Sequence, residues 1–123
     1  MVASMLRDIC IDCTDNRRLA RFWAQVLGYT VSEPDSAEAP AESICINSLS
    51  DGLRIWFNAV PEPKTVKNRV HLDITMPNDA ELERLAALGA RPLQEVLGDG
   101  GALKWTIMAD PEGNEFCAFP PRD

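Results

Sequence analysis

Hydrophobic and polar residues alternate strictly from residue 70 to residue 76, and this pattern predicts a β-strand. Because successive side chains of a strand point to opposite faces, an apolar face that begins with Val70 opposes a polar face of His71, Asp73 and Thr75. Burying three polar groups is costly unless each finds a partner. We therefore expect these side chains either to be paired or to line a wet cavity.

The same alternation occurs in residues 7–13, where Asp8 and Asp12 share the polar face of a second predicted strand. A helix follows, because apolar residues recur at positions 19, 22, 23, 26 and 27. Asp15 or Asn16 can cap the start of this helix, and Gly28 can end it.

The rest of the first half predicts three further strands. Residues 29–32 form a short strand, residues 33–42 an exposed loop, and residues 43–48 and 53–59 a hairpin across the turn 49–52. The pair Asp51-Gly52 is a typical hairpin turn.

Residues 60–68 contain two prolines and no periodicity, so we interpret them as a linker. After the strand at 70–76, Asn78 can cap a helix whose apolar stripe ends before Gly89. That stripe consists of Leu82, Leu85, Ala86 and Leu88. A strand at 91–96, a glycine-rich loop at 98–101 and a hairpin of residues 103–109 and 114–119 complete the second half.

The two halves correspond by a constant offset. Asp8 lies 63 residues before His71, and Trp56 lies 61 residues before Cys117. We therefore predict an α+β fold of two tandem β-α-β-β-β units within a single domain of residues 1–123. Repeat one covers about 5–60 and repeat two about 68–120.

Composition excludes several classes of protein. The formal charge of −7 disfavours a nucleic-acid surface, which needs clustered Lys and Arg. No apolar run is long enough for a membrane span, and the first residues lack the pattern of a signal peptide. We expect a cytoplasmic protein with no membrane or nucleic-acid partner, and four reduced cysteines.

Three segments together resemble the vicinal oxygen chelate superfamily, which contains glyoxalases, extradiol dioxygenases and bleomycin-resistance proteins. They are residues 9–15 with 19–23 and 27–29, the run 60–73, and the ending Asp110-Pro111-Glu112-Gly113-Asn114 with residues 115–117. The resemblance is greatest to small glyoxalase-like members. It implies two curled mixed sheets around a concave cleft.

In metal-dependent members of this superfamily, four ligands occupy positions that map to Asp8, Trp56, His71 and Cys117. Only His71 keeps the usual ligand identity, Trp56 offers an N–H but no lone pair, and Cys117 replaces the expected glutamate. We therefore favour no cofactor. A divalent metal such as Zn²⁺, held by Asp8, His71, Cys117 and water, stays open.

The predicted concave faces supply the candidate site. Their residues are Asp8, Cys10, Asp12, Arg54, Trp56, Asn58, His71, Asp73, Thr75, Glu115, Cys117 and Phe119. His71 with Asp8 is the candidate catalytic pair, and the others except Cys10 are candidate ligand-binding residues. Aromatic rings among polar groups suit a flat or amphipathic organic molecule. The alternative is that Asp12, Arg54 and Asp73 are paired structurally.

Other motifs have structural interpretations. Cys10 and Cys13 point to opposite faces of a strand, so they cannot share a metal. The loop Gly98–Gly101 lacks the Lys-Ser/Thr of a phosphate loop and can form a lip over the site. Lys64, Lys67 and Arg69 are interpreted as solvated.

Two functions remain open from the sequence. The first is a metal-free protein that binds or sequesters a small organic molecule, as bleomycin-resistance proteins do. The second is an enzyme, a lyase, isomerase or dioxygenase, that uses His71 as a metal ligand or general base. The resemblance also implies a homodimer.

Overall fold

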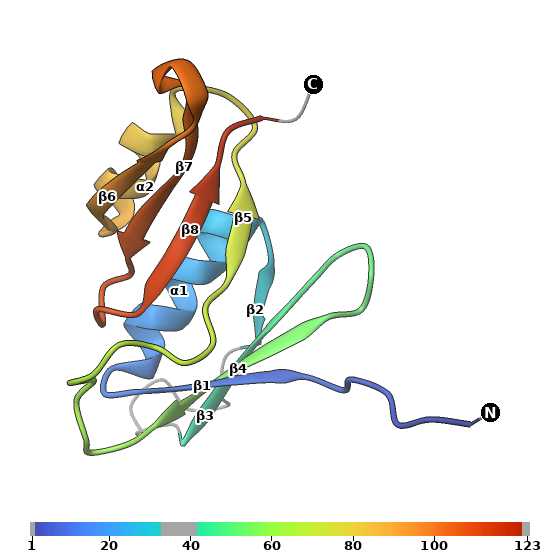
Figure 1. Cartoon of the computed structure of the whole chain (residues 1–123). Helices are drawn as coiled ribbons and strands as arrows, with labels where there is room; N and C mark the ends of the chain where they lie inside the picture. Colours follow the sequence, from blue (N-terminus) through green and yellow to red (C-terminus); the bar gives the residue numbers. More distant parts are fainter. Residues whose placement is uncertain (1, 33–41, 122–123) are drawn as a thin grey trace. The chain divides into compact units, whose positions relative to one another are not determined.

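The structure is a computed structural model that describes residues 2–32 and 42–121 (Figure 1). The chain divides into two compact units, Met1–Pro63 and Lys64–Asp123, and each is described by itself. Nine of the ten residues of the predicted loop 33–42 lie outside the described residues; Glu42 is exposed.

Unit 1 is a four-stranded mixed sheet with one helix. Its elements are β1 (Ile9–Cys13), α1 (Asn16–Leu27), β2 (Thr30–Ser32), β3 (Ser43–Asn47) and β4 (Arg54–Ala59). The strand order is β1-β4-β3-β2, with β1 parallel to β4 and the remaining pairs antiparallel. The β-α-β-β-β pattern predicted for the first repeat is confirmed.

Helix α1 begins and ends where the sequence predicts. The Asp15 side chain accepts a hydrogen bond from the Arg18 backbone N–H at 3.1 Å, which satisfies one donor of the first turn. Gly28 ends the helix at φ 70°, a conformation that costs little only without a Cβ. The buried side chains of α1 are Asn16, Leu19, Ala20, Phe22, Trp23 and Ala24.

The core of unit 1 lies between α1 and the two central strands, β3 and β4. Their register pairs Ile44 with Phe57 and Ile46 with Ile55, so these four side chains share one face, and none is more than 2% exposed. Helix α1 contacts both strands through its apolar stripe. This burial leaves the opposite face of the sheet to polar side chains.

Unit 2 repeats the architecture. Its elements are β5 (Asp73–Thr75), α2 (Glu81–Leu88), β6 (Arg91–Leu97), the 3-10 turn η1 (Asp99–Gly101), β7 (Leu103–Ala109) and β8 (Glu115–Phe119). The strand order β5-β8-β7-β6 matches that of unit 1, again with its first strand parallel to its last (Figure 1). The predicted glycine-rich loop contains η1.

The predicted strand 70–76 is too long. The strand β5 covers only Asp73–Thr75, and Val70 is 80% exposed rather than on a buried face. The reason lies in its only neighbour, β8, which begins at Glu115. The Glu115 backbone carbonyl accepts a hydrogen bond from the Asn68 side chain at 3.4 Å, so the segment before β5 is held by a side chain instead of a ladder.

The predicted cap of the second helix is also displaced. The N-cap of α2 is Ala80, which makes no side-chain cap. Asn78 instead closes a turn before the helix, where its Oδ1 accepts a hydrogen bond from the Ala80 N–H at 3.0 Å.

The apolar stripe of α2 is only partly covered. Leu85 is fully buried, but Leu82 and Leu88 are half-buried and Ala86 is exposed. A helix of eight residues makes little more than two turns. It contacts β6, whereas α1 contacts all four strands of its sheet.

The segment before β8 is a turn built on one carboxylate. Asp110 is 2% exposed, and its Oδ1 accepts hydrogen bonds from the backbone N–H groups of Glu112 and Asn114, both at 2.9 Å. The Asn114 side-chain amide donates to both carboxylate oxygens, at 3.2 and 3.0 Å. The family-like segment 110–114 therefore orients β8.

Among the described residues, no helix is both long and apolar enough to cross a membrane.

Candidate functional site

The polar faces of the two sheets place equivalent residues at equivalent points. In unit 1, Cys10 pairs with Trp56 across β1 and β4. In unit 2, Asp73 pairs with Cys117 across β5 and β8. The register agrees with the sequence offsets, so each unit carries one polar cluster at the start of its parallel strand pair.

The cluster of unit 1 centres on the Asp8 carboxylate, which is 13% exposed. Arg54 donates to it twice, from Nε to Oδ1 at 2.9 Å and from an η-nitrogen to Oδ2 at 3.2 Å. The Trp56 indole N–H donates to Oδ2 at 3.0 Å. Asp8 is therefore a paired carboxylate, which supports the structural alternative for Arg54.

These contacts act on the charge of Asp8. Burial raises the pKa of the Asp8 carboxyl, but the hydrogen bonds from Trp56 and Arg54 and the charge of Arg54 outweigh burial, so the net pKa is lowered. Asp8 is ionised at neutral pH. A bidentate guanidinium is a strong partner for it, and a general base must give up this partner to accept a proton.

The rest of the predicted unit 1 face is a hydrogen-bonded polar surface. The Asn58 side chain donates to Asp12 Oδ1 at 3.4 Å and accepts from the Ser43 hydroxyl at 2.7 Å. Cys10 is exposed on this face, while Cys13 is buried on the other, as the alternation predicts.

The cluster of unit 2 consists of His71, Asp73 and Cys117. One ligand atom from each lies within 4.8 Å of the others, and His71 Nδ1 is 3.4 Å from Asp73 Oδ1. His71 and Asp73 are exposed, whereas Cys117 is 8% exposed. Within unit 2, the carboxylate beside His71 is that of Asp73.

The Cys117 thiol is protonated at neutral pH. Burial raises the pKa of this thiol, and the charge and hydrogen bonding of Asp73 raise the pKa further. A cysteine in this state is a weak nucleophile. Its chemical use therefore depends on a group that displaces the proton.

Glu115 is occupied by the segment that was predicted to be a solvated linker. Lys64 Nζ donates to its Oε1 at 2.9 Å, and the Asn68 backbone N–H donates to its Oε2 at 3.0 Å. The side chains of Lys64 and Glu115 are only 19% and 18% exposed, so the prediction of a solvated Lys64 is wrong. A parallel-strand end needs an anchor for the incoming chain, and this ion pair provides it.

A pocket of about 380 Å³ lies at the far end of this sheet face. Three predicted ligand-binding residues line it: Asp73, Thr75 and Phe119. Lys104 contributes a cation, and Pro120 and Pro121 complete the wall. The Phe119 ring packs against Trp105 at a centroid distance of 5.5 Å.

The sequence interpretation missed Lys64, Lys104 and Trp105. Trp105 and Phe119 share a face because β7 and β8 are antiparallel neighbours, with Ile107 opposite Cys117. The alternation of residues 103–109 could have placed Trp105 on this face, but no sequence signal pairs Lys64 with Glu115.

The residues present fit a divalent metal in one unit only. In unit 1, the Asp8 oxygens are taken by Arg54 and Trp56, and Trp56 offers no lone pair. In unit 2, an imidazole, a carboxylate and a thiol match the nitrogen, oxygen and sulfur ligands that Zn²⁺ accepts. The ligand set predicted from sequence, Asp8 with His71 and Cys117, is therefore replaced within unit 2 by Asp73 with the same two residues.

We expect the buried carboxylates to make stability depend on pH. Burial raises the pKa of Glu115, but the Asn68 N–H and Lys64 outweigh it, so the net pKa is lowered, as for Asp8. Folded protein with lowered carboxyl pKa values gains stability above the ordinary value of about 4 and loses it as pH falls through the folded values. Urea unfolding between about pH 6 and pH 3 should show a falling free energy of unfolding.

The variant Lys64→Met should flatten this dependence, because Glu115 loses its ammonium partner. Lys67→Met removes the same charge from an exposed position and serves as the control. An equal pH slope in both variants would contradict the contribution assigned to Glu115.

Residues 8–119 match the model of a family described as a glyoxalase-like domain. No curated protein sequence is significantly similar to the chain.

Solved structures of similar fold cover nearly the whole chain. One is a fosfomycin resistance protein, FosX, from Listeria monocytogenes, a mutant complexed with Mn(II) and 1S,2S-dihydroxypropylphosphonic acid (TM-score 0.73, 14% identity, 98% of this chain and 93% of that chain). Another is TnmS3, an antibiotic binding protein from a Streptomyces species (TM-score 0.65, 15% identity, 99% of each chain). A third is a glyoxalase/bleomycin resistance protein/dioxygenase family enzyme from Burkholderia phytofirmans (TM-score 0.65, 17% identity, 94% of this chain and 98% of that chain). At these identities the likeness shows the fold.

Proposed function

We propose that this chain, which belongs to the glyoxalase-like domain family of the vicinal oxygen chelate superfamily, binds and sequesters a small organic molecule without a metal. The observation that carries this proposal is the pocket of about 380 Å³ lined by Asp73, Thr75 and Phe119. Its volume lies in the range of small-molecule sites, which begins at about 300 Å³.

The lining indicates what kind of molecule fits. The Phe119 ring, held by Trp105, offers a flat apolar surface. Asp73 and Lys104 offer one charge of each sign, and Thr75 offers a hydroxyl. A flat molecule with polar substituents would use all three kinds of contact.

Binding without a metal is supported by the chemistry of unit 1. Of the four positions that hold metal in metal-dependent relatives, the one at Asp8 is neutralised by Arg54 and the one at Trp56 carries a donor. Both changes favour an organic ligand over a cation. TnmS3 is described as an antibiotic binding protein, which supports small-molecule binding by this fold.

We predict that protein dialysed against EDTA binds at least one member of a set of flat aromatic acids and amines. Amide shift changes in a ¹⁵N NMR titration should cluster at residues 73–75, 104 and 119–121. Phe119→Ala removes the flat surface and should weaken binding about tenfold, since an aromatic contact of this kind contributes about 1 kcal/mol or more. Phe22→Leu changes a buried aromatic residue of unit 1 and is the control.

The result that would overturn the proposal is binding that occurs only after Zn²⁺ is added, or no saturable binding of any member. Elemental analysis of the purified protein should find well below one metal per chain.

The His71, Asp73 and Cys117 cluster favours a second candidate, a metal-dependent lyase, isomerase or dioxygenase. These three residues would hold the ion, which would supply Lewis-acid activation of an oxygen or a water. Under this alternative, about one tightly held Zn²⁺ per chain should be found, and His71→Ala should lose it. Asp8, if it acts with His71, would need release from Arg54.

We also propose that the chain forms a homodimer. Val2, Met5 and Leu6 precede β1 and are each at least 78% exposed, which leaves apolar surface for a second copy. Light scattering should give about twice 13.6 kDa at micromolar concentration, and a mass of 13.6 kDa throughout would reject the dimer.

A further inference from the structure

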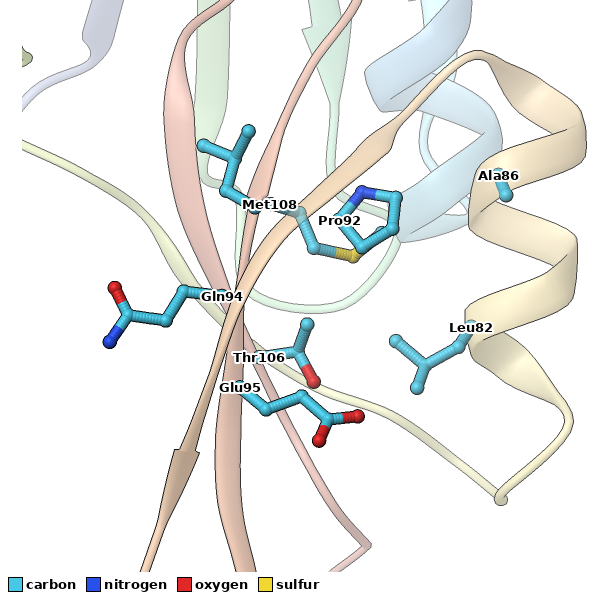
Figure 2. Close-up of a pocket in the computed structure, with 8 residues that line it drawn as sticks. Leu82, Ala86, Pro92, Gln94, Glu95, Thr106 and Met108 are labelled. Carbon is cyan, nitrogen blue, oxygen red and sulfur yellow. The ribbon is translucent and has the colours of Figure 1, made fainter.

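Unit 2 contains a second pocket, of about 360 Å³, between α2 and its own sheet (Figure 2). It arises because α2 is short and leaves its apolar stripe half-covered. Leu82 and Ala86 of α2 face Pro92 of β6 and Met108 of β7 across it. This pocket lies on the opposite side of the sheet from Cys117, because Met108 is opposite Phe116 while Ile107 is opposite Cys117.

The wall of this pocket carries a polar group without a partner. Thr106 is 2% exposed, and its hydroxyl makes no hydrogen bond within residues 2–32 and 42–121. Such a group costs about 1–3 kcal/mol and is rare in folded proteins. In Figure 2 the Thr106 hydroxyl points to the same side as Leu82.

A carboxylate stands beside this hydroxyl. Glu95 is directly opposite Thr106 in the β6–β7 register, so the two side chains lie on the same face of the sheet. Glu95 is the only ionisable residue of the pocket lining. No ion pair of Glu95 is found within the described part of the chain.

We propose that this pocket binds an apolar primary amine, with an aromatic or branched aliphatic body between Leu82, Ala86, Pro92 and Met108. The protonated amine donates to the Glu95 carboxylate and to the Thr106 hydroxyl oxygen. This occupant meets both polar requirements at once, since a cation neutralises Glu95 and a donor satisfies Thr106. An anion of the same shape would be repelled by Glu95. The site is separate from the pocket at Asp73, and it does not depend on the function proposed there.

The probe is tryptamine, and indole-3-propionate is the matched anion of closely similar shape. In a ¹⁵N NMR titration, tryptamine should shift amides at residues 82–86, 92–95 and 106–108, and indole-3-propionate should bind at least tenfold more weakly. Glu95→Gln should weaken tryptamine binding about tenfold and abolish the preference for the amine. Glu83→Gln removes the same charge from the exposed side of α2 and should leave binding unchanged.

A second variant separates binding from folding. Thr106→Val replaces the unpartnered hydroxyl by a methyl group of similar shape. It should raise the melting temperature of the free protein while weakening tryptamine binding at least threefold. Three outcomes would each overturn the proposal: no binding at millimolar tryptamine, equal binding of the two probes, or shifts confined to residues 73–75 and 119–121.

Discussion

Replacing Phe57 by alanine should lower the free energy of unfolding by about 3–5 kcal/mol, as for other large-to-small changes in a close-packed core. Phe57 has no exposed surface and lies on the α1-facing side of the central strand β4. Its ring pairs with Ile44 across the ladder, so removing it opens a cavity that β3 and α1 cannot close. Urea unfolding followed by far-ultraviolet circular dichroism measures the loss.

The matched control is Leu82→Ala in α2. Leu82 is half-buried and already borders the pocket beneath α2, so this change should cost only about 1 kcal/mol. If the two variants lost equal stability, α2 would cover its sheet as tightly as α1 does. The pocket beneath α2 would then not exist in solution.

Replacing Asp110 by alanine should cost about 2–4 kcal/mol, because several hydrogen bonds to one buried carboxylate are lost together. The Glu112 and Asn114 N–H groups and the Asn114 amide would all be left without this acceptor. The turn sets where β8 begins, so the change should also loosen the strand that carries Cys117 and Phe119. Chemical denaturation gives the stability, and amide exchange of residues 115–119 gives the loosening.

Two further variants test whether the carboxylate itself matters. Asp110→Asn keeps one acceptor oxygen and should lose less stability than Asp110→Ala. Asp51→Ala alters the exposed turn of unit 1, where Asp51 accepts one backbone hydrogen bond from Leu53, and its effect should be much smaller. An effect of Asp110→Ala no larger than that of Asp51→Ala would contradict the role of this turn.

Periodicity predicted the two repeats well because each half is amphipathic at the period of its own elements. The α1 stripe with its Asp15 cap and Gly28 end, and the alternating strand β4, are local patterns that burial enforces. The polar faces followed from the same alternation, and they include every residue predicted for the site. Asp73, Thr75 and Phe119 were therefore expected on one face before their pocket was seen.

Partners across the chain were not predictable in this way. Alternation gave the face of Asp8 but not the two donors, Arg54 and Trp56, that occupy its carboxylate. It placed Lys64 in a linker, although the ion pair with Glu115 joins positions 51 residues apart. The strand 70–76 failed for a related reason, since a strand lasts only as long as its neighbour offers hydrogen bonds.

The sequence by itself determined the repeat, the helices, the strand faces and the residue types available for chemistry, because these depend on spacing along the chain. Only the tertiary structure decided which carboxylates are free. It paired Asp8 with Arg54, brought Asp73 to within reach of His71 and Cys117, and left the Thr106 hydroxyl without a partner under a short helix. Those outcomes depend on distances between residues far apart in the sequence, and hydrophobic patterning does not encode such distances.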